Sequence, residues 1–280
     1  MEPKHPKKLI VPKQPSLVMT TSHYYKAVMT AYGISHFYAF RVEEDVHDIL
    51  SIVPDGCVDF LFYCSQDHPY ASIIGTRLKA SPMIGKPGDY FFGVRFMPGK
   101  VLLPDTVKPD ELVEGEAALM EFMKEEEVFD KIIMSRDFLA QIRNFLEFYV
   151  NYHQDALEHL DDRNLGNYLV DEITQRAGNI KIEELGELTG YSVRYVNKVF
   201  KENMGISPKT YCKIARFQTI LNSLKWEEDE KDLLAIAMNA GYYDQSHMMK
   251  DFRKYTNMTP VRYVKSLEEA EYKNRLIILG

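Results

Sequence analysis

The pattern of hydrophobic residues divides the chain near residue 115. Before this point, aromatic and branched residues form short runs that are separated by turn sequences such as Pro54-Asp55-Gly56 and Pro98-Gly99. The runs occupy residues 32–42, 49–53, 58–64, 70–78 and 90–97. Short strands at this spacing, with turns and no helices between them, predict an antiparallel β-barrel or β-sandwich.

Beyond residue 115 the apolar positions follow a helical period. Phe138, Ile142, Phe145 and Tyr149 share one face of a helix, at spacings of i, i+4, i+7 and i+11. The stripe is wide, and two interpretations of it remain open. The helix could dock on the β domain, or it could form the interface of a homodimer.

The last third of the chain contains one short helical unit twice. The corresponding segments are Leu185–Tyr191 and Ile236–Tyr242, followed by Phe200–Tyr211 and Phe252–Tyr263. Each unit predicts a short helix, a glycine turn and a second helix, because Gly accepts the positive φ of a tight turn. Gly186 and Ala237 take the same place and let two helices cross closely. We therefore expect helix-turn-helix motifs at about residues 181–204 and 233–255.

The second helix of each unit has a polar, cationic ridge. In the first unit the ridge consists of Arg194, Asn197, Lys198 and Lys201. In the second unit it consists of Gln245, Ser246, Lys250 and Arg253. Guanidinium and amide groups suit base edges in a major groove, and ammonium groups suit phosphates. One such ridge is usually an ordinary solvated face, but two at equivalent positions of a repeat indicate a DNA-binding surface.

A long helix is expected to join the two units. Ser207-Pro208 predicts an N-cap followed by proline at the first helical position, and the helix should continue to about Lys225. Such a helix is a rod of roughly 27 Å. Successive major grooves on one face of a duplex are about 34 Å apart, so two heads on this rod are expected to enter adjacent grooves.

The charge distribution supports DNA binding only locally. The net charge of −7 argues against general coating of nucleic acid. Residues 178–265 contain 14 Lys and Arg against 11 Asp and Glu, and five of these acids lie in residues 227–232, an expected turn between helices. Without this turn the repeat region is clearly basic, as a nucleic-acid-binding domain should be.

Several other classes of protein are disfavoured. No run of 18 apolar residues predicts a membrane span, and residues 1–15 lack the apolar core of a secretory signal, so we expect a cytoplasmic protein. Cys57, Cys64 and Cys212 form no CxxC pair, which favours buried, reduced thiols. The β region has no His-x-His pair of the kind that holds a metal. We expect no catalytic residue, no metal and no cofactor.

Two ionic side chains lie inside apolar strands. Alternation puts Asp59 on one strand face with Tyr63, and Arg95 on the face of its own strand that carries Met97. An ion inside a β domain needs a partner. Asp59 and Arg95 could satisfy each other or nearby backbone, or they could orient a polar ligand together with Tyr63.

The repeat region, from about Arg163 to Leu267, resembles the AraC/XylS-type transcription regulators. The matching motifs are Leu185-Gly186-x3-Gly190-Tyr191-Ser192, Phe200-Lys201-Glu202, Ile236-Ala237-x3-Gly241-Tyr242-Tyr243-Asp244-Gln245-Ser246, Phe252-Arg253-Lys254 and Thr259-Pro260-x2-Tyr263. Gly186 stands where the family usually has Ala, at some cost in helix propensity. The resemblance implies base contacts by Arg194, Asn197, Lys198, Gln245, Ser246 and Lys250, and phosphate contacts by Lys201 and Arg253.

The resemblance also implies the domain order and the partners. It predicts an α+β protein with a cupin-like β sensor domain in residues 1–115 and a helical linker or dimerisation segment in 116–155. An AraC-type DNA-binding domain in 156–267, all α, and a C-terminal tail in 268–280 would follow. Such a protein would be an activator that binds two adjacent major grooves of double-stranded DNA and contacts RNA polymerase. Its β domain would bind a small-molecule effector or mediate pairing.

Two alternatives remain open. The protein could be a DNA-binding regulator without a small-molecule effector, controlled by a partner protein. It could also be a DNA-repair methyl acceptor joined to the same type of DNA-binding head. That second activity needs a cluster of four cysteines around zinc, which Cys57 and Cys64 cannot supply.

Overall fold

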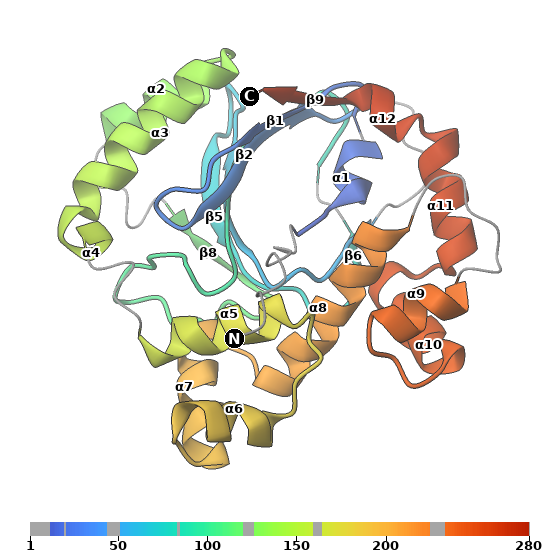
Figure 1. The fold of residues 1–280 in the computed structure, drawn as a ribbon. Helices are drawn as coiled ribbons and strands as arrows, with labels where there is room; N and C mark the ends of the chain where they lie inside the picture. The colour runs from blue at the N-terminus through green and yellow to red at the C-terminus, as the bar shows by residue number, and fades with distance from the viewer. Residues whose placement is uncertain are drawn as a thin grey trace.

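A curved β-sheet with helices packed around it makes up the molecule (Figure 1). A computed structural model of the chain describes residues 12–19, 21–43, 51–82, 85–119, 126–158, 164–224 and 233–279. Residues 1–11 and the acidic turn at residues 227–232 lie outside the described residues. The β-rich first part and the helical second part confirm the predicted α+β layout.

The described part of the chain contains one seven-stranded sheet, in the order β8-β5-β4-β7-β2-β1-β9. Its strands are β1 (Tyr24–Val28), β2 (Ile34–Arg41), β4 (Val58–Tyr63), β5 (Tyr70–Ile74), β7 (Tyr90–Phe96), β8 (Glu116–Ala118) and β9 (Leu276–Leu279). A separate pair consists of β3 (Ser51–Ile52) and β6 (Ser81–Pro82). β8 and β9 are the edges of the main sheet as described, so it is an open, curved sheet and not a closed barrel.

One face of the sheet packs against two helices, α2 (Glu126–Met134) and α3 (Phe138–Tyr152), as Figure 1 shows. The side chain of Asp137 caps α3 by accepting hydrogen bonds from the backbone N–H groups of Leu139 and Ala140. The apolar stripe of α3 is buried against the sheet through Phe138, Phe145 and Tyr149. Of the two interpretations of this stripe, the docked helix is therefore the arrangement that this structure contains.

Two short strands lie outside the expected β domain of residues 1–115. β8 pairs antiparallel with β5, although it falls in the expected linker segment. β9 falls in the expected C-terminal tail and pairs parallel with β1, from Tyr24 opposite Leu276 to Ala27 opposite Leu279. Edge strands of three or four residues carry too little alternation to be read from sequence. The tail therefore belongs to the sheet.

The helical part contains both expected helix-turn-helix units. Its helices are α5 (Leu165–Gln175), α6 (Ile182–Thr189), α7 (Val193–Met204), α8 (Pro208–Ser223), α9 (Leu233–Asn239), α10 (Gln245–Thr256), α11 (Pro260–Glu269) and α12 (Tyr272–Arg275). Two shorter helices, α1 (Pro15–Met19) and α4 (Gln154–Glu158), lie elsewhere. No helix of the described residues is both long enough and apolar enough to span a membrane.

α8 joins the two units and belongs to both of their cores. Tyr211 and Ile214 near its beginning pack in the core of the first unit, whereas Phe217 and Ile220 pack in the core of the second. α8 has 16 residues. This length corresponds to about 24 Å. Because both ends are packed, α8 fixes the separation of the two units.

Candidate nucleic-acid interface and sheet cavity

The first helix-turn-helix unit is held by a glycine turn and a serine cap. Gly190 ends α6 with a φ of 73° and donates its N–H to the Gly186 carbonyl. The Ser192 hydroxyl then accepts from the Tyr195 N–H at 3.3 Å and starts α7. A Cβ on Gly186 would lie 2.9 Å from the Tyr191 carbonyl oxygen. The close crossing of α6 and α7 therefore needs a very small residue at this position.

The second unit repeats this construction with different residues. Gly241 has a φ of 80°, and a Cβ there would overlap the side-chain amide of Asn179, which precedes the first unit. The Asp244 carboxylate accepts from the His247 N–H at 2.7 Å and caps α10. Ala237 is fully buried where α9 meets α10. Each second helix thus begins at a fixed cap after a tight turn.

The outer face of α7 carries the four residues of the first ridge, Arg194, Asn197, Lys198 and Lys201. The two lysines and the arginine are exposed, and Asn197 is half-buried. The Asn197 Nδ2 donates to the Val193 carbonyl at 2.8 Å, so this amide must rotate before it can contact a base. The Lys198 Nζ lies 3.8 Å from Glu202, in an exposed pair that contributes little to stability.

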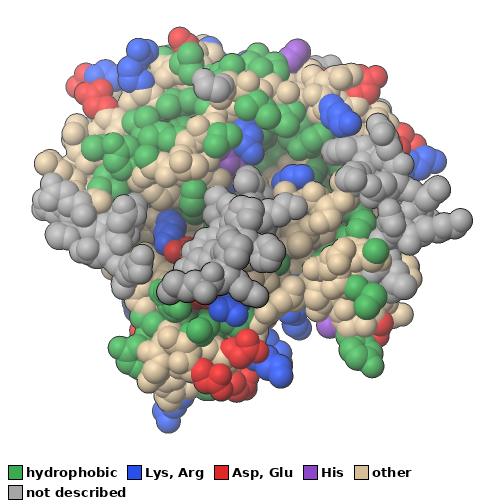
Figure 2. All heavy atoms as spheres, viewed as in Figure 1, with side chains coloured by type: hydrophobic (Ala, Val, Ile, Leu, Met, Phe, Trp, Pro, Cys, Tyr) green, Lys and Arg blue, Asp and Glu red, His purple; other side chains and the backbone are tan. Residues whose placement is uncertain are grey.

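The outer face of α10 carries the second ridge in the same arrangement. Gln245, Ser246, Lys250 and Arg253 are all exposed, and together with Met249 they line a shallow surface depression. The end of α10 touches the β part, where the Ala80 N–H donates to the Lys254 carbonyl at 3.4 Å. Figure 1 shows the two units on either side of α8, and Figure 2 shows two lobes at the lower edge of the molecule.

Three exposed tyrosines beside the ridges were not singled out by the sequence analysis. The rings of Tyr191 and Tyr195 are in contact, tilted by 40° with centroids 4.9 Å apart, and Tyr243, just before α10, is 92% exposed. Phenol groups donate to phosphate and sugar oxygens in protein–DNA interfaces. Their proximity to the predicted caps Ser192 and Asp244 was the signal in the sequence that could have indicated them.

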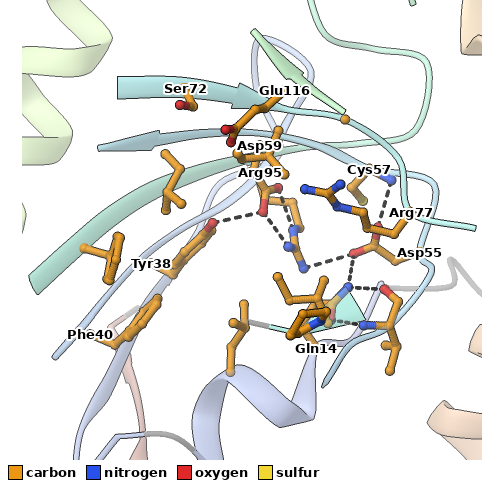
Figure 3. A pocket seen from close by; sticks show the side chains of 18 of the residues that line it. Gln14, Tyr38, Phe40, Asp55, Cys57, Asp59, Ser72, Arg77, Arg95 and Glu116 are labelled. Atoms are coloured by element: carbon orange, nitrogen blue, oxygen red, sulfur yellow. Dashed lines mark hydrogen bonds and ion pairs between the residues drawn. The ribbon is translucent and has the colours of Figure 1, made fainter. Parts of the chain in front are cut away.

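The face of the sheet opposite α2 and α3 encloses a cavity of about 250 Å³ (Figure 3). Tyr38, Phe40, Leu61 and Phe91 from the central strands contribute its apolar wall, and Leu17 of α1 lies opposite them. These residues come from alternate positions of each strand, as a two-faced sheet requires. The cavity lies on the inner, concave side of the sheet.

A buried charge network crosses this cavity. Arg95 donates to both carboxylate oxygens of Asp59, at 2.8 and 2.5 Å, and its third nitrogen lies 3.0 Å from Asp55. The Tyr38 hydroxyl donates to Asp59 at 2.9 Å. The Tyr38 ring lies against Gly93, and a Cβ at position 93 would overlap this ring. Desolvation raises the pKa of Asp55, although Arg95 opposes this shift.

The structure brings together two of the three residues considered for a ligand site. Asp59 and Arg95 bind each other, as one of the two interpretations expected. Tyr63 lies further along the same strand, outside the cavity wall, and its hydroxyl donates to Asp89 at 2.7 Å. The sequence did not indicate Asp55, because this second carboxylate partner of Arg95 lies in a loop and not on a strand.

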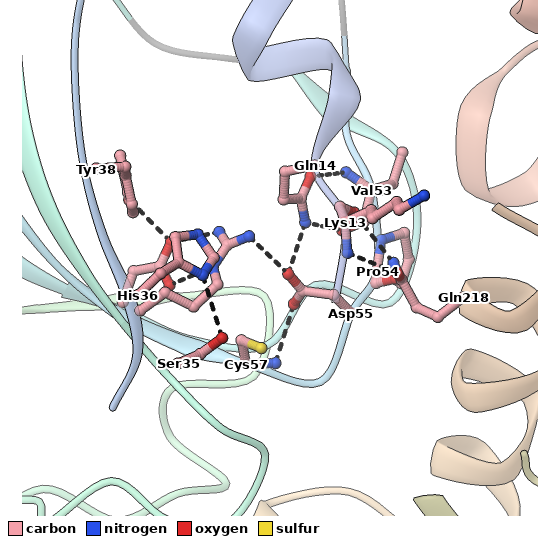
Figure 4. Close-up of polar contacts among 12 residues, drawn as sticks. Lys13, Gln14, Ser35, His36, Tyr38, Val53, Pro54, Asp55, Cys57 and Gln218 are labelled. Carbon is pink, nitrogen blue, oxygen red and sulfur yellow. Dashed lines mark hydrogen bonds and ion pairs between the residues drawn. The ribbon is translucent and has the colours of Figure 1, made fainter. Parts of the chain in front are cut away.

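Hydrogen bonds connect the cavity wall to α8 (Figure 4). The Gln14 side chain donates to Asp55 at 2.8 Å. Next to it, the Lys13 N–H donates to the Gln218 side chain at 2.9 Å, and Gln218 donates to the Pro54 carbonyl at 2.8 Å. Gln218 is buried in the middle of α8. The charge network and the helix between the two units are therefore in contact through one short loop and the residues before α1.

Two glycine turns of the β part also touch the first unit. Gly56 has a φ of +77°, and a Cβ there would lie 2.6 Å from the Tyr211 ring. Gly99 has a φ of +72°, and a Cβ would lie 2.9 Å from the Asn203 amide and 3.2 Å from the Met204 sulfur. Both turns need glycine for their backbone and for the close approach of α7 and α8.

The remaining chemistry of the described residues is limited. They contain no group of three or more His, Cys, Asp or Glu side chains that could hold a metal. The three cysteines are free and buried, and burial raises the pKa of Cys64 and of Cys212 to about 11. These thiols are protonated at neutral pH and are poor nucleophiles.

The fold and its exposed ridges define a protein with two helix-turn-helix units on a common helix beneath a β domain. Residues 185–266 match the family model described as a helix-turn-helix domain. This region is therefore a helix-turn-helix domain, in agreement with the resemblance to the AraC/XylS-type regulators found in the sequence.

Known relatives resemble mainly this part of the chain. An uncharacterized HTH-type transcriptional regulator of Haemophilus influenzae is 31% identical over 114 residues, which cover 41% of this chain and 38% of that protein. The probable transcription factor PqrA of Proteus vulgaris is 29% identical over 89 residues, 32% of this chain and 71% of that protein. These relatives are described as regulators and not as enzymes, in agreement with the sequence analysis.

A likeness to one solved structure extends over both parts. ToxT of Vibrio cholerae is 11% identical, with 88% of this chain and 96% of that chain covered, at a TM-score of 0.43.

Proposed function

We propose that this protein is a sequence-specific transcription regulator that binds double-stranded DNA through α7 and α10. The observation that carries the proposal is the duplicated unit, with an exposed cationic ridge at the same place in both copies. Arg194, Asn197, Lys198, Gln245, Ser246 and Lys250 would contact base edges. Lys201 and Arg253 would contact phosphates.

The position of α8 supports binding to two adjacent major grooves. The helix spans about 24 Å, and each unit extends beyond one of its ends. Recognition helices in adjacent grooves must lie about 34 Å apart on one face of the duplex. The packed cores at both ends of α8 keep this separation fixed, so binding would need little rearrangement.

We also propose that the β domain controls the DNA-binding part. The cavity on the inner face of the sheet would hold a small-molecule effector, and Gln218 and Gly56 would connect its wall to α8. Activation of transcription in the cytoplasm, through contact with RNA polymerase, completes the proposal. A homodimer would need a surface other than the buried stripe of α3.

One observation favours a regulator without a small-molecule effector. Arg95, Asp55 and Asp59 satisfy one another inside the cavity, so this network needs no ligand to compensate its charges. A metabolite panel separates the two candidates, since a ligand that binds only the folded chain raises the melting temperature.

Selection of bound sequences from a random DNA pool, with the full-length chain, tests DNA binding directly. We expect enrichment of two short motifs about one helical turn apart. Arg194→Ala and Lys250→Ala should each weaken binding by roughly 1–3 kcal/mol and relax sequence preference at one motif only. Lys108→Ala, an exposed lysine of the β part, is the matched control. A pool without enrichment, or equal effects of all three variants, would contradict the proposal.

A further inference from the structure

The polar side chains that line the cavity fall into two sets. The first set is fully occupied with internal hydrogen bonds and ion pairs, and it consists of Gln14, Tyr38, Asp55, Asp59 and Arg95. The second set consists of Ser72, Arg77 and Glu116, whose side chains have no hydrogen bond or ion pair to any described residue. In the first set one buried atom, Arg95 Nη1, has no hydrogen bond, but it lies 3.0 Å from the Asp55 carboxylate. The second set therefore has the hydrogen-bonding capacity that no internal partner engages.

The second set lies along the β5–β8 edge of the cavity (Figure 3). Ser72 is on β5 and Glu116 is on the neighbouring strand β8, while Arg77 follows β5 by three residues. The opposite end is apolar, where Leu17, Phe40 and Phe91 form part of one buried cluster. The cavity therefore has unpaired polar groups at the β5–β8 edge and an apolar end at Leu17, Phe40 and Phe91, and the network of Tyr38, Asp59 and Arg95 also lines it.

Arg77 is the most informative member of this set. Its Nε atom is buried and has no hydrogen-bond partner. Figure 3 shows the side chain extending toward the centre of the cavity, beside Arg95. A buried donor of a charged group is unfavourable without an acceptor, and a ligand oxygen at this point would remove the penalty. The charges of Asp55 and Asp59 are already engaged with Arg95.

The Ser72 side chain supports an acceptor on the ligand. Ser72 is buried, with 8% of its surface exposed, and its hydroxyl can donate a hydrogen bond to an oxygen of a ligand in the cavity. Glu116 is exposed and lies where the cavity meets solvent. A carboxylate matches the planar guanidinium better than any neutral acceptor, because two parallel charge-assisted hydrogen bonds form.

We propose that the cavity binds a small amphipathic carboxylate. The carboxylate would lie on Arg77 and Ser72, and an apolar body, best aromatic, would lie against Tyr38, Phe40 and Phe91. This inference rests on the proposed function, in which the cavity holds the effector, and it names the chemical class of that effector.

Three molecules with the same body and different head groups test this inference on the full-length chain. They are 3-phenylpropionate, 3-phenylpropan-1-ol and 3-phenylpropan-1-amine, and binding is measured by thermal shift and by titration calorimetry. We expect the carboxylate alone to raise the melting temperature. Arg77→Gln should weaken its binding by roughly tenfold or more, whereas Glu116→Gln should leave it equal or stronger.

Three results would overturn the inference. They are equal or tighter binding of the amine, no binding of the carboxylate, and unchanged carboxylate affinity in Arg77→Gln. Arg77→Lys provides a second variant, since it keeps the charge and loses the planar fork, and it should fall between wild type and Arg77→Gln.

DNA binding measured in parallel separates this inference from the proposed function. Arg77 lies outside both helix-turn-helix units, so Arg77→Gln should bind the selected DNA as the wild type does when no ligand is present. DNA binding without carboxylate binding would contradict the ligand class alone. Carboxylate binding without DNA binding would contradict the proposed function alone.

Discussion

Charged residues of this molecule occupy two different environments. On the outer faces of α7 and α10 they are exposed, where their charges cost little and can meet phosphates. Inside the β part, Arg95 lies between two carboxylates and is compensated. Lys26 of β1 differs from Arg95, because it is largely buried and, like Arg77, has no ion-pair partner among the residues that the structure describes.

Lys26 makes stability depend on pH. Burial, with smaller effects of Arg95 and Lys13, lowers the pKa of Lys26 from 10.5 to about 8. The folded chain thus binds this proton more weakly than the unfolded chain does. The charged amine therefore destabilises the fold below pH 8, and the penalty disappears as pH rises through 10.5.

Lys26→Met should accordingly increase the free energy of unfolding at pH 7, by on the order of 1–3 kcal/mol. The gain should shrink between about pH 8 and pH 10.5. Urea unfolding of the wild type and of Lys26→Met at several pH values in this range measures the difference in the free energy of unfolding. Lys108→Met, at an exposed position, should show no such pH dependence. If the increase in the free energy of unfolding stays constant with pH, the lowered pKa of Lys26 is contradicted.

Among the elements, α8 has the largest number of roles. It separates the two units, it contributes to both of their cores, and its Gln218 binds the loop next to Asp55. An insertion near Phe217 would disturb the second core as well as the spacing, because Phe217 is fully buried against Phe252 and Tyr255. A milder change is needed to test the role of the helix.

Gln218→Met keeps the size of the side chain and removes its hydrogen bonds. The Lys13 N–H and the Pro54 carbonyl would then lose partners at a buried site, so we expect a loss of about 1–3 kcal/mol in the free energy of unfolding. Ser223→Ala, at an exposed position near the end of α8, should change this free energy by less than about 0.5 kcal/mol. Equal effects of the two substitutions would show that the contact between α8 and the β part contributes little.

At the scale of the whole molecule, the last elements of the chain pack against the first ones. After the second helix-turn-helix unit, α12 packs near α1 and β9 joins the edge of the sheet beside β1. Arg275 strengthens this packing by donating to the carbonyls of Met19 and Thr21, at 3.2 and 2.9 Å. The end of the DNA-binding part is therefore attached to the β part.

Deletion of residues 276–280 should detach this end. We expect a melting temperature lower by a few degrees, roughly 2–4 °C per kcal/mol for a chain of this size class. Backbone amides of β1 should exchange hydrogen faster, because β1 would become an edge strand. Removal of Gly280 alone is the control. Unchanged protection of Tyr24–Val28 would contradict the pairing.

The sequence alone determined the two helix-turn-helix units and most of the central strands. Caps such as Ser192 and Asp244, turns such as Gly190, and helical periods are local signals, so a few neighbouring residues are enough to reveal them. The resemblance to the AraC/XylS-type regulators followed from the same local motifs, and residues 185–266 match a helix-turn-helix domain. The DNA contacts of the two ridges remain predictions.

Only the tertiary structure decided how these parts meet. Asp55 reaches Arg95 across 40 positions of the chain, Pro54 meets Gln218, and Leu276 pairs with Tyr24. Such contacts join residues that carry no shared local pattern, and their energy appears only when the chain has closed long loops. The cavity and its unpaired Arg77 exist for the same reason, because they are formed by strands that come together only in the folded sheet.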